Sequence, residues 1–237
     1  MQLKQNAIKN NKADKLKNPK QDKKETASAG KAEDKSRPNL IAGMELEEFL
    51  AEDSKYRLKI EKTIEELGSS FSLLLTASPS ELGKAKTAVI KRFAKEKGLI
   101  LYITFNQSAS KLLNELSAKG IDSKKIFVID IVSKDKGYEI ASSDYFSDFD
   151  SPSQLTDLLL TLEEKMSAKD KPSLLFDSIS TFLVYNDKES AQKFLHSLIA
   201  KVHKADSRVV LLASNDSASK DALSTISQFC DRFYQLD

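Results

Sequence analysis

Short apolar runs, each too brief to form a helix, most constrain what this chain can fold into. The first reads FSLLLTA over residues 71–77. Runs of the same kind recur at 99–104, 126–131, 173–177, 209–213 and 232–236. A strand that is apolar along nearly its whole length is buried on both faces, as in a parallel sheet covered by helices. The sequence therefore predicts about six strands of a mostly parallel sheet.

Segments with helical spacing of apolar residues separate these runs. The predicted helices cover residues 44–67, the segment around 89–93, and residues 109–116, 151–166, 188–204 and 217–229. Gly68, Gly98 and Gly120 follow the first three as stop signals. Ser151 and Pro152 begin the fourth as its cap and first-turn proline. Strands alternating with helices predict an α/β fold, a three-layer αβα sandwich.

The first 40 residues have a different composition. Lys alternates with Asn, Asp and Ser, and large apolar side chains are nearly absent. Residues 1–37 hold 11 of the 37 Lys and Arg residues and 5 of the 35 Asp and Glu residues, so the remainder has 26 and 30. Such a segment buries too little surface to offset its ordering entropy. We expect a disordered Lys-rich tail over 1–40, a helical segment over 41–67 and one α/β domain over 68–237.

The single cysteine, Cys230, excludes an intrachain disulfide and a Cys-rich zinc site. It is expected to be a small buried thiol, and His196 and His203 are expected to lie on the surface. No apolar run reaches the ~20 residues of a membrane span, and the N-terminus lacks the apolar core of a signal peptide. These features predict a cytoplasmic protein without membrane contact.

A degenerate phosphate-binding loop follows the first strand. The pattern G-x-x-x-x-G-K-[ST] between a strand and a helix binds phosphate through backbone N–H groups, a lysine and a hydroxyl. Here the same frame reads Ser80-x-x-x-x-Ala85-Lys86-Thr87, with Gly83 inside it. The lysine and the hydroxyl are present, but Ser and Ala replace the two glycines that let the backbone turn around the phosphates. These five residues are the predicted nucleotide-binding residues of this loop.

An aspartate ends a later strand. Asp177 closes the run SLLFD, and Ser178 follows it. In nucleotide-binding proteins an aspartate at the end of such a strand holds Mg²⁺. With Thr87, it forms the predicted metal-binding pair if ATP binds. ATP and Mg²⁺ are the candidate cofactors, and the alternative is a site that binds no nucleotide and is a structural relic.

Three stretches together resemble the KaiC-like branch of the RecA-type ATPases, particularly its small archaeal members. They are LGKAKTAVIKRF at 82–93, LYITFNQSASKL at 101–112 and LLFDSIS at 174–180. Their order and spacing match that family over residues 68–237. The resemblance implies a RecA-like P-loop fold, ATP binding, and self-assembly or pairing with active relatives.

The chain departs from that family where catalysis is performed. Asn106 and Gln107 stand where the family has a pair of glutamates. The resemblance implies that one glutamate of such a pair polarises the attacking water. Amides cannot accept a proton as a carboxylate does, and losing a general base removes about 10²–10⁴-fold in rate. No catalytic residue is therefore predicted.

These features predict a catalytically weak or inactive RecA/KaiC-like protein that regulates or scaffolds through protein contacts. One alternative is an active ATPase with a variant loop. Another is a nucleic-acid-associated protein that binds through the basic residues of 1–40. The aromatic and acidic loop 144–150 either docks a partner or packs its aromatic rings onto the body.

Overall fold

The computed structural model describes residues 43–133, 146–168, 170–216 and 220–236. The chain divides into two units, Met1–Leu40 and Ile41–Asp237. The predicted tail lies outside the described residues, as does most of the loop at 133–150. The described helices and strands all belong to the second unit.

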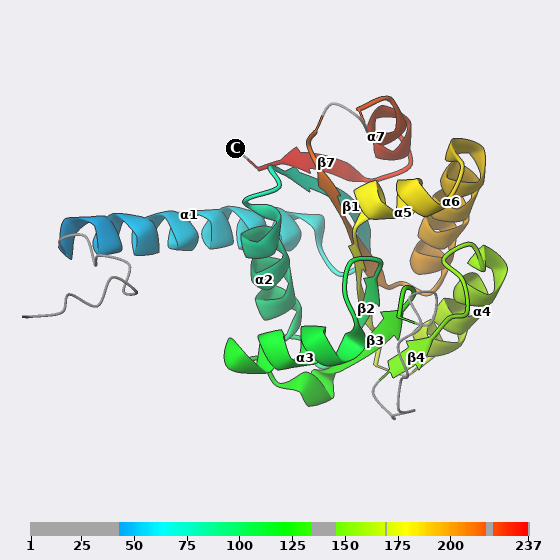
Figure 1. Cartoon of the computed structure of the whole chain (residues 1–237), viewed down its shortest axis with the longest axis horizontal. Coiled ribbons are helices and arrows are strands. Elements are labelled where there is room, and N and C mark those ends of the chain that lie inside the picture. Colours follow the sequence, from blue (N-terminus) through cyan, green and yellow to red (C-terminus); the bar gives the residue numbers. More distant parts are fainter. Residues whose placement is uncertain (1–42, 134–145, 169, 217–219, 237) are drawn as a thin grey trace, which may run out of the picture. The chain divides into compact units, whose positions relative to one another are not determined.

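Helices and strands alternate along most of the chain, as predicted (Figure 1). In order they are α1 (Gly43–Leu67), β1 (Phe71–Ala77), α2 (Leu82–Phe93), β2 (Ile100–Thr104), α3 (Ala109–Ala118), a 3₁₀ turn (Ser123–Lys125), β3 (Ile126–Asp130), β4 (Phe146–Asp148), α4 (Leu155–Met166), β5 (Ser173–Asp177), α5 (Ile179–Tyr185), α6 (Lys188–Lys204), β6 (Arg208–Ser214), α7 (Lys220–Ser227) and β7 (Arg232–Gln235).

The strands form one sheet of seven, ordered β4-β3-β2-β5-β6-β1-β7, and every neighbouring pair is parallel. β6 thus lies between β1, which leads into α2, and β5, which ends at Asp177. The predicted fold class, an α/β sandwich built on a mostly parallel sheet, is confirmed. The seventh strand, β4, was not predicted, because three residues are too short to leave a pattern.

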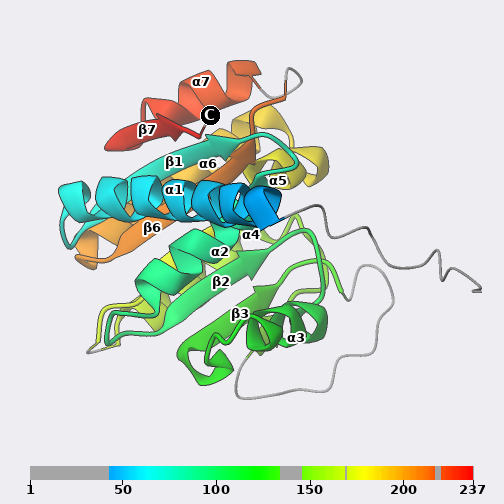
Figure 2. The same cartoon turned by 90° about the vertical axis from the view of Figure 1, so that its left-hand side faces the viewer.

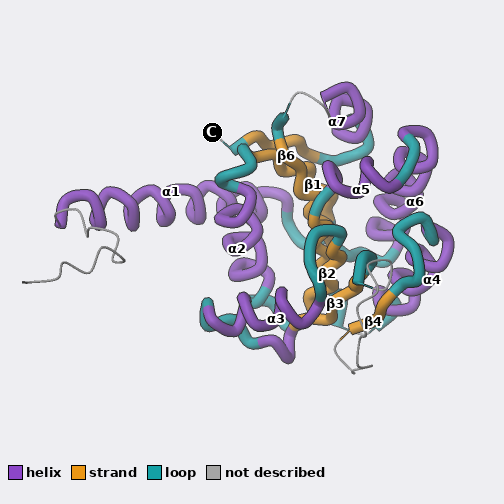
Figure 3. The backbone as a smooth tube through the Cα atoms, in the orientation of Figure 1, coloured by secondary structure: helices purple, strands orange, loops and turns teal. Residues whose placement is uncertain are grey.

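Helices cover both faces of the sheet, which makes three layers (Figures 2 and 3). Consecutive residues of β1 show the alternation: Leu74 packs into the core shared with α4, α5, α6 and α7, while Leu73 and Leu75 pack into the core shared with α1, α2 and α3. Both cores are apolar, and all seven residues of β1 are buried. The continuous apolar strands of the sequence therefore reflect burial on two sides.

Glycines end two helices as predicted. Gly68 follows α1 with φ of 80° and Gly120 follows α3 with φ of 71°, a backbone region that glycine enters without steric cost. The stop predicted at Gly98 is wrong, because α2 already ends at Phe93. Gly98 instead allows a close approach, since a Cβ atom there would lie 2.3 Å from the carbonyl oxygen of Lys171.

The predicted start of α4 is also wrong. α4 begins at Leu155, with Gln154 as its N-cap residue. The Gln154 side-chain oxygen accepts hydrogen bonds from the backbone N–H groups of Asp150 and Ser151. Residues 150–154 thus form a local turn held by the Gln154 side chain, and the helix begins a turn later than predicted.

Part of the loop at 144–150 packs onto the body. Phe149 is buried in the core that α4 covers, and its N–H donates to the carbonyl of Asp130. This aromatic ring therefore contacts the domain itself. The stretch 134–145 lies outside the described residues.

Asp130 joins several segments at the carboxyl edge of the sheet. Its fully buried carboxylate accepts hydrogen bonds from the N–H groups of Ala109, Val132 and Ser133, at 2.7–3.1 Å, and from the Ser133 hydroxyl at 2.6 Å. One side chain thus connects the end of β3 to the start of α3. A buried carboxylate with this many donors is fully compensated.

Replacing Asp130 by Ala is expected to lower the free energy of unfolding by about 3 kcal/mol or more. Each buried donor left without a partner costs about 1–3 kcal/mol. Urea denaturation measures the change. The control Asp187→Ala removes an exposed cap from α6 and should cost only about 1 kcal/mol. Equal losses in the two variants would contradict this role for Asp130.

Candidate functional site

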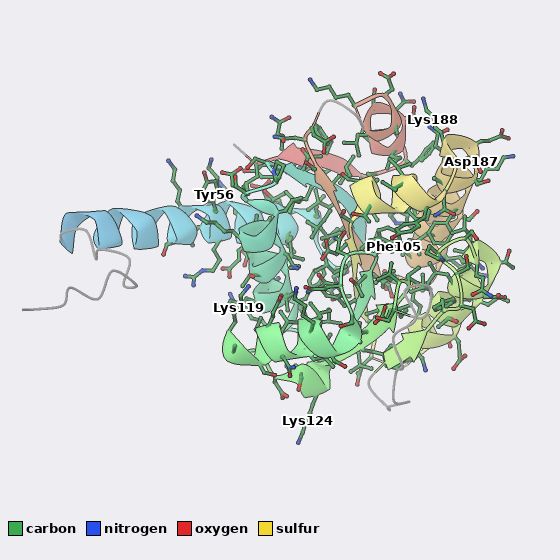
Figure 4. All side chains as sticks on the ribbon, in the orientation of Figure 1. Tyr56, Phe105, Lys119, Lys124, Asp187 and Lys188 are labelled. Atoms are coloured by element: carbon green, nitrogen blue, oxygen red, sulfur yellow. The ribbon has the colours of Figure 1, made fainter. Side chains whose placement is uncertain are left out.

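The candidate site lies at the carboxyl edge of the sheet, where parallel strands direct their last residues toward one region. β2 and β5 are neighbours, with Thr104 opposite Asp177 in register. The N–H of Phe105 donates to the Asp177 carbonyl at 2.8 Å and extends this pairing past the strand end. Phe105 is labelled in Figure 4 near the centre of the domain. The residues that follow β2 are thereby held against Asp177.

Three side chains of this chain hold the Asp177 carboxylate. The Tyr102 hydroxyl donates to Oδ2, the Asn106 amide donates to Oδ1 at 2.9 Å, and Lys86 Nζ lies 3.4 Å from Oδ2 as an ion pair. The Asp177 side chain is only 8% exposed and that of Lys86 16%. The structure thus brings together two of the predicted site residues, Lys86 and Asp177, while their nucleotide-binding role stays a prediction. Both carboxylate oxygens already accept hydrogen bonds.

Tyr102 is the residue that sequence reasoning missed. It is fully buried in β2. Burial, followed by the adjacent Asp177 charge and the hydrogen bond to it, raises the pKa of Tyr102 well above its ordinary value. The available signal was the tyrosine within the apolar run LYIT, since a buried tyrosine hydroxyl requires a partner.

Asn106 connects two parts of the site. Its amide nitrogen donates to Asp177, and its amide oxygen accepts a hydrogen bond from the Thr181 hydroxyl on α5. Donor and acceptor are both used, which an amide provides and a carboxylate does not. Gln107 points elsewhere, because its amide donates to Glu115 at 3.3 Å. The two positions that the family resemblance pairs thus have separate partners here.

The segment predicted to be a phosphate loop is mostly helical. α2 begins at Leu82, so Gly83, Ala85, Lys86 and Thr87 all lie within the helix. Ala85 is fully buried in the core. The connection from β1 is a short turn, in which the Ser78 carbonyl accepts hydrogen bonds from the N–H groups of both Glu81 and Leu82.

A carboxylate stands at the start of α2. Glu81 is the N-cap residue, and its carboxylate accepts a hydrogen bond from the Ser78 hydroxyl at 2.6 Å. That bond, together with one from Tyr56, lowers the pKa of Glu81 and keeps it charged. Ser80, a predicted phosphate contact, shares a hydrogen bond with the same Ser78 hydroxyl at 2.9 Å.

Thr87 faces away from Asp177. Its hydroxyl donates to the Gly83 carbonyl at 2.9 Å and accepts from Lys119 Nζ at 3.0 Å. The predicted pairing of Thr87 with Asp177 on one Mg²⁺ ion stays a prediction, and these contacts do not bring the two side chains together. Among the described residues, no group of three or more His, Cys, Asp or Glu side chains is placed to hold a metal ion.

Residues 54–237 match a protein family described as a family of unknown function, DUF7090. The chain belongs to this family. No curated protein matches the sequence.

Among solved structures, the chain is similar to a KaiC-like protein of the hyperthermophilic archaeon Pyrococcus horikoshii. The two are 20% identical with a TM-score of 0.44, and the match covers 61% of each chain. The chain thus spans less than two thirds of that protein.

Residues outside the edge site have structural partners in this DUF7090 member. Burial raises the pKa of the Cys230 thiol to about 12, so it stays protonated and unreactive. His196 packs edge-on against the Phe229 ring at 5.1 Å, and His203 lies 3.4 Å from both Ser72 and Asp231. In the part of the chain that the structure describes, no helix is long and apolar enough to cross a membrane.

Replacing Tyr102 by Phe is expected to lower stability at pH 8 by about 1.5–3 kcal/mol, the usual contribution of a hydrogen bond to a charged group. Because the folded pKa of Tyr102 lies above the unfolded value of about 10, its contribution is complete below pH 10. It is lost as the pH rises toward the folded pKa. The difference between wild type and Tyr102→Phe should therefore shrink between pH 9.5 and 11, by up to about 1.4 kcal/mol per pH unit above 10.

Urea denaturation across this pH range measures the difference. Asn106→Ala is the matched control, since it removes another donor to Asp177 without removing a titrating group. Its difference from wild type should stay constant. If the stability difference between wild type and Tyr102→Phe also stayed constant across this pH range, the raised pKa of Tyr102 would be contradicted.

Proposed function

We propose that this protein is a catalytically inactive RecA/KaiC-like domain that works as a regulatory or scaffolding module through protein contacts. The observation that carries the proposal is the set of contacts that the Asp177 carboxylate makes. Its carboxylate, which would hold Mg²⁺ in an active relative, is instead bound by Tyr102, Asn106 and Lys86 of the same chain.

Magnesium binding would have to compete with these contacts. Mg²⁺ requires oxygen ligands near octahedral geometry and gives up its water reluctantly. Both oxygens of Asp177 already accept hydrogen bonds in a mostly buried position. Removing the donors from a buried polar group costs free energy that a weakly held ion does not recover. The site therefore favours the metal-free arrangement.

Lys86 is also paired within the protein. In a phosphate loop the lysine reaches the β- and γ-phosphates of the nucleotide. Lys86 lies four residues into α2 and pairs with Asp177 at 3.4 Å. Its charge thus stabilises a carboxylate of the protein.

The start of α2 is unfavourable for phosphate. A helix N-terminus binds anions through free N–H groups and the helix dipole. Here Glu81 is the N-cap residue, and hydrogen bonds from Ser78 and Tyr56 lower the pKa of its carboxyl, so a negative charge stands at that end. A phosphate placed beside Glu81 would meet like charge, and the turn at 78–81 is too short to wrap around it. This supports a site without nucleotide.

Protein contacts are the remaining route to function. Edge strands offer unpaired backbone groups to partners, and β7 is an edge strand of the sheet that carries Phe233, 49% exposed. Val184 on α5 is 79% exposed. These exposed apolar side chains are available to a partner, in line with the self-association that the KaiC-like resemblance implies.

The test is ATP turnover by the full-length chain with Mg²⁺. We expect phosphate release at the background rate in wild type, unchanged in Lys86→Ala and in the control Lys193→Ala, whose lysine is exposed on α6 and pairs with Glu189. Turnover in wild type and Lys193→Ala that disappears in Lys86→Ala would overturn the proposal and establish an active ATPase with a variant loop.

A further inference from the structure

A hollow of about 430 Å³ lies between α1, α2 and the end of α3. It is separate from the Asp177 site, because its α2 residues are Gly83, Lys84, Thr87, Ala88 and Lys91, whereas Lys86 contacts Asp177. Figure 4 labels Tyr56 on α1 and Lys119 at the end of α3, and both residues line the hollow.

Four basic side chains converge on this hollow. Arg57 comes from α1, Lys84 and Lys91 from α2, and Lys119 from the end of α3. Its lining includes no Asp or Glu among the described residues. Glu81 lies at the border, where it interacts with Lys84 and Tyr56. Among the described residues, no ion pair joins Arg57, Lys91 or Lys119 to a carboxylate.

The arrangement is not explained by the overall charge. Beyond residue 37 the chain has 26 basic and 30 acidic residues, so its average charge is negative. Cations that line one hollow repel one another, and a bound anion would relieve this repulsion.

Local contacts orient the groups. Lys119 Nζ donates to the Thr87 hydroxyl at 3.0 Å, which draws the end of α3 toward α2. Lys84 Nζ lies 5.8 Å from the centre of the Tyr56 ring, a cation–π contact between α2 and α1. Two of the four cations are therefore positioned by the protein itself, which reduces the ordering entropy lost when a ligand binds.

We propose that this hollow binds a small ligand that carries two or more phosphate groups. Arg57 supplies a planar fork that matches phosphate oxygens, and the lysines supply point charges. The Ser54 and Thr87 side chains add hydroxyls to the lining. Because the cations surround a concave space and do not form an extended stripe, the site fits a compact anion better than a nucleic-acid strand.

Calorimetry with sodium tripolyphosphate on the full-length chain, without Mg²⁺ and at physiological salt, tests the proposal. The pocket variant combines Arg57→Gln, Lys91→Gln and Lys119→Gln. The control combines Lys111→Gln, Lys124→Gln and Lys188→Gln, which removes the same charge from exposed positions elsewhere. We expect wild type and control to bind, and the pocket variant to bind roughly tenfold more weakly or worse.

Thermal unfolding gives a second readout, since a ligand that binds only the folded state raises the melting temperature. Tripolyphosphate should raise it in wild type and control but not in the pocket variant. Equal binding by the pocket and control variants would overturn the proposal, as it would place the anion elsewhere. Pocket-dependent binding of a single-stranded oligonucleotide without tripolyphosphate binding would also overturn it, in favour of a nucleic-acid surface.

This outcome is independent of the proposed function. Nucleotide held at the Asp177 site would depend on Lys86 and Mg²⁺, whereas binding in the hollow depends on Arg57, Lys91 and Lys119. Failure of one proposal therefore leaves the other standing.

Discussion

The buried carboxylate of Asp177 is the constraint on which the site depends. A carboxylate at this depth is stable only when its charge is compensated, and Lys86, Tyr102 and Asn106 compensate it from α2, β2 and the turn after β2. The carboxyl edge of the sheet, where parallel α/β sheets commonly bind ligands, is here occupied by these contacts within the chain.

The sheet determines which residues can reach Asp177. Because every strand pair is parallel, the ends of β2 and β5 lie at one edge, and Tyr102 on β2 sits two residues before the position opposite Asp177. β6 lies between β1 and β5, and α2 follows β1. Lys86 therefore reaches the Asp177 carboxylate from α2. The early start of α2 at Leu82 places this lysine within the helix. The strand order and the start of α2 thus determine which side chains surround Asp177.

The strands were predictable because burial on both faces leaves continuous apolar runs. Residue type and position singled out Lys86 and Asp177, which the structure places in contact, while their role in nucleotide binding stays a prediction. Short elements were missed: β4 has three residues, and α5 immediately follows β5. The helical form of residues 82–87 was also missed, since the phosphate-loop pattern assumes a loop wherever it matches. Tyr102 could not be paired with Asp177 from the sequence alone, because their contact depends on strand order.

Unfolding of Asp177→Asn tests the central claim most directly, alone and combined with Lys86→Met. If the chain itself holds the carboxylate, Asp177→Asn should lower the free energy of unfolding by about 2 kcal/mol or more. The loss should also be smaller in the Lys86→Met background, because the two side chains interact. Unchanged or increased stability in Asp177→Asn would contradict the account, since a carboxylate kept for a metal ion destabilises the metal-free fold.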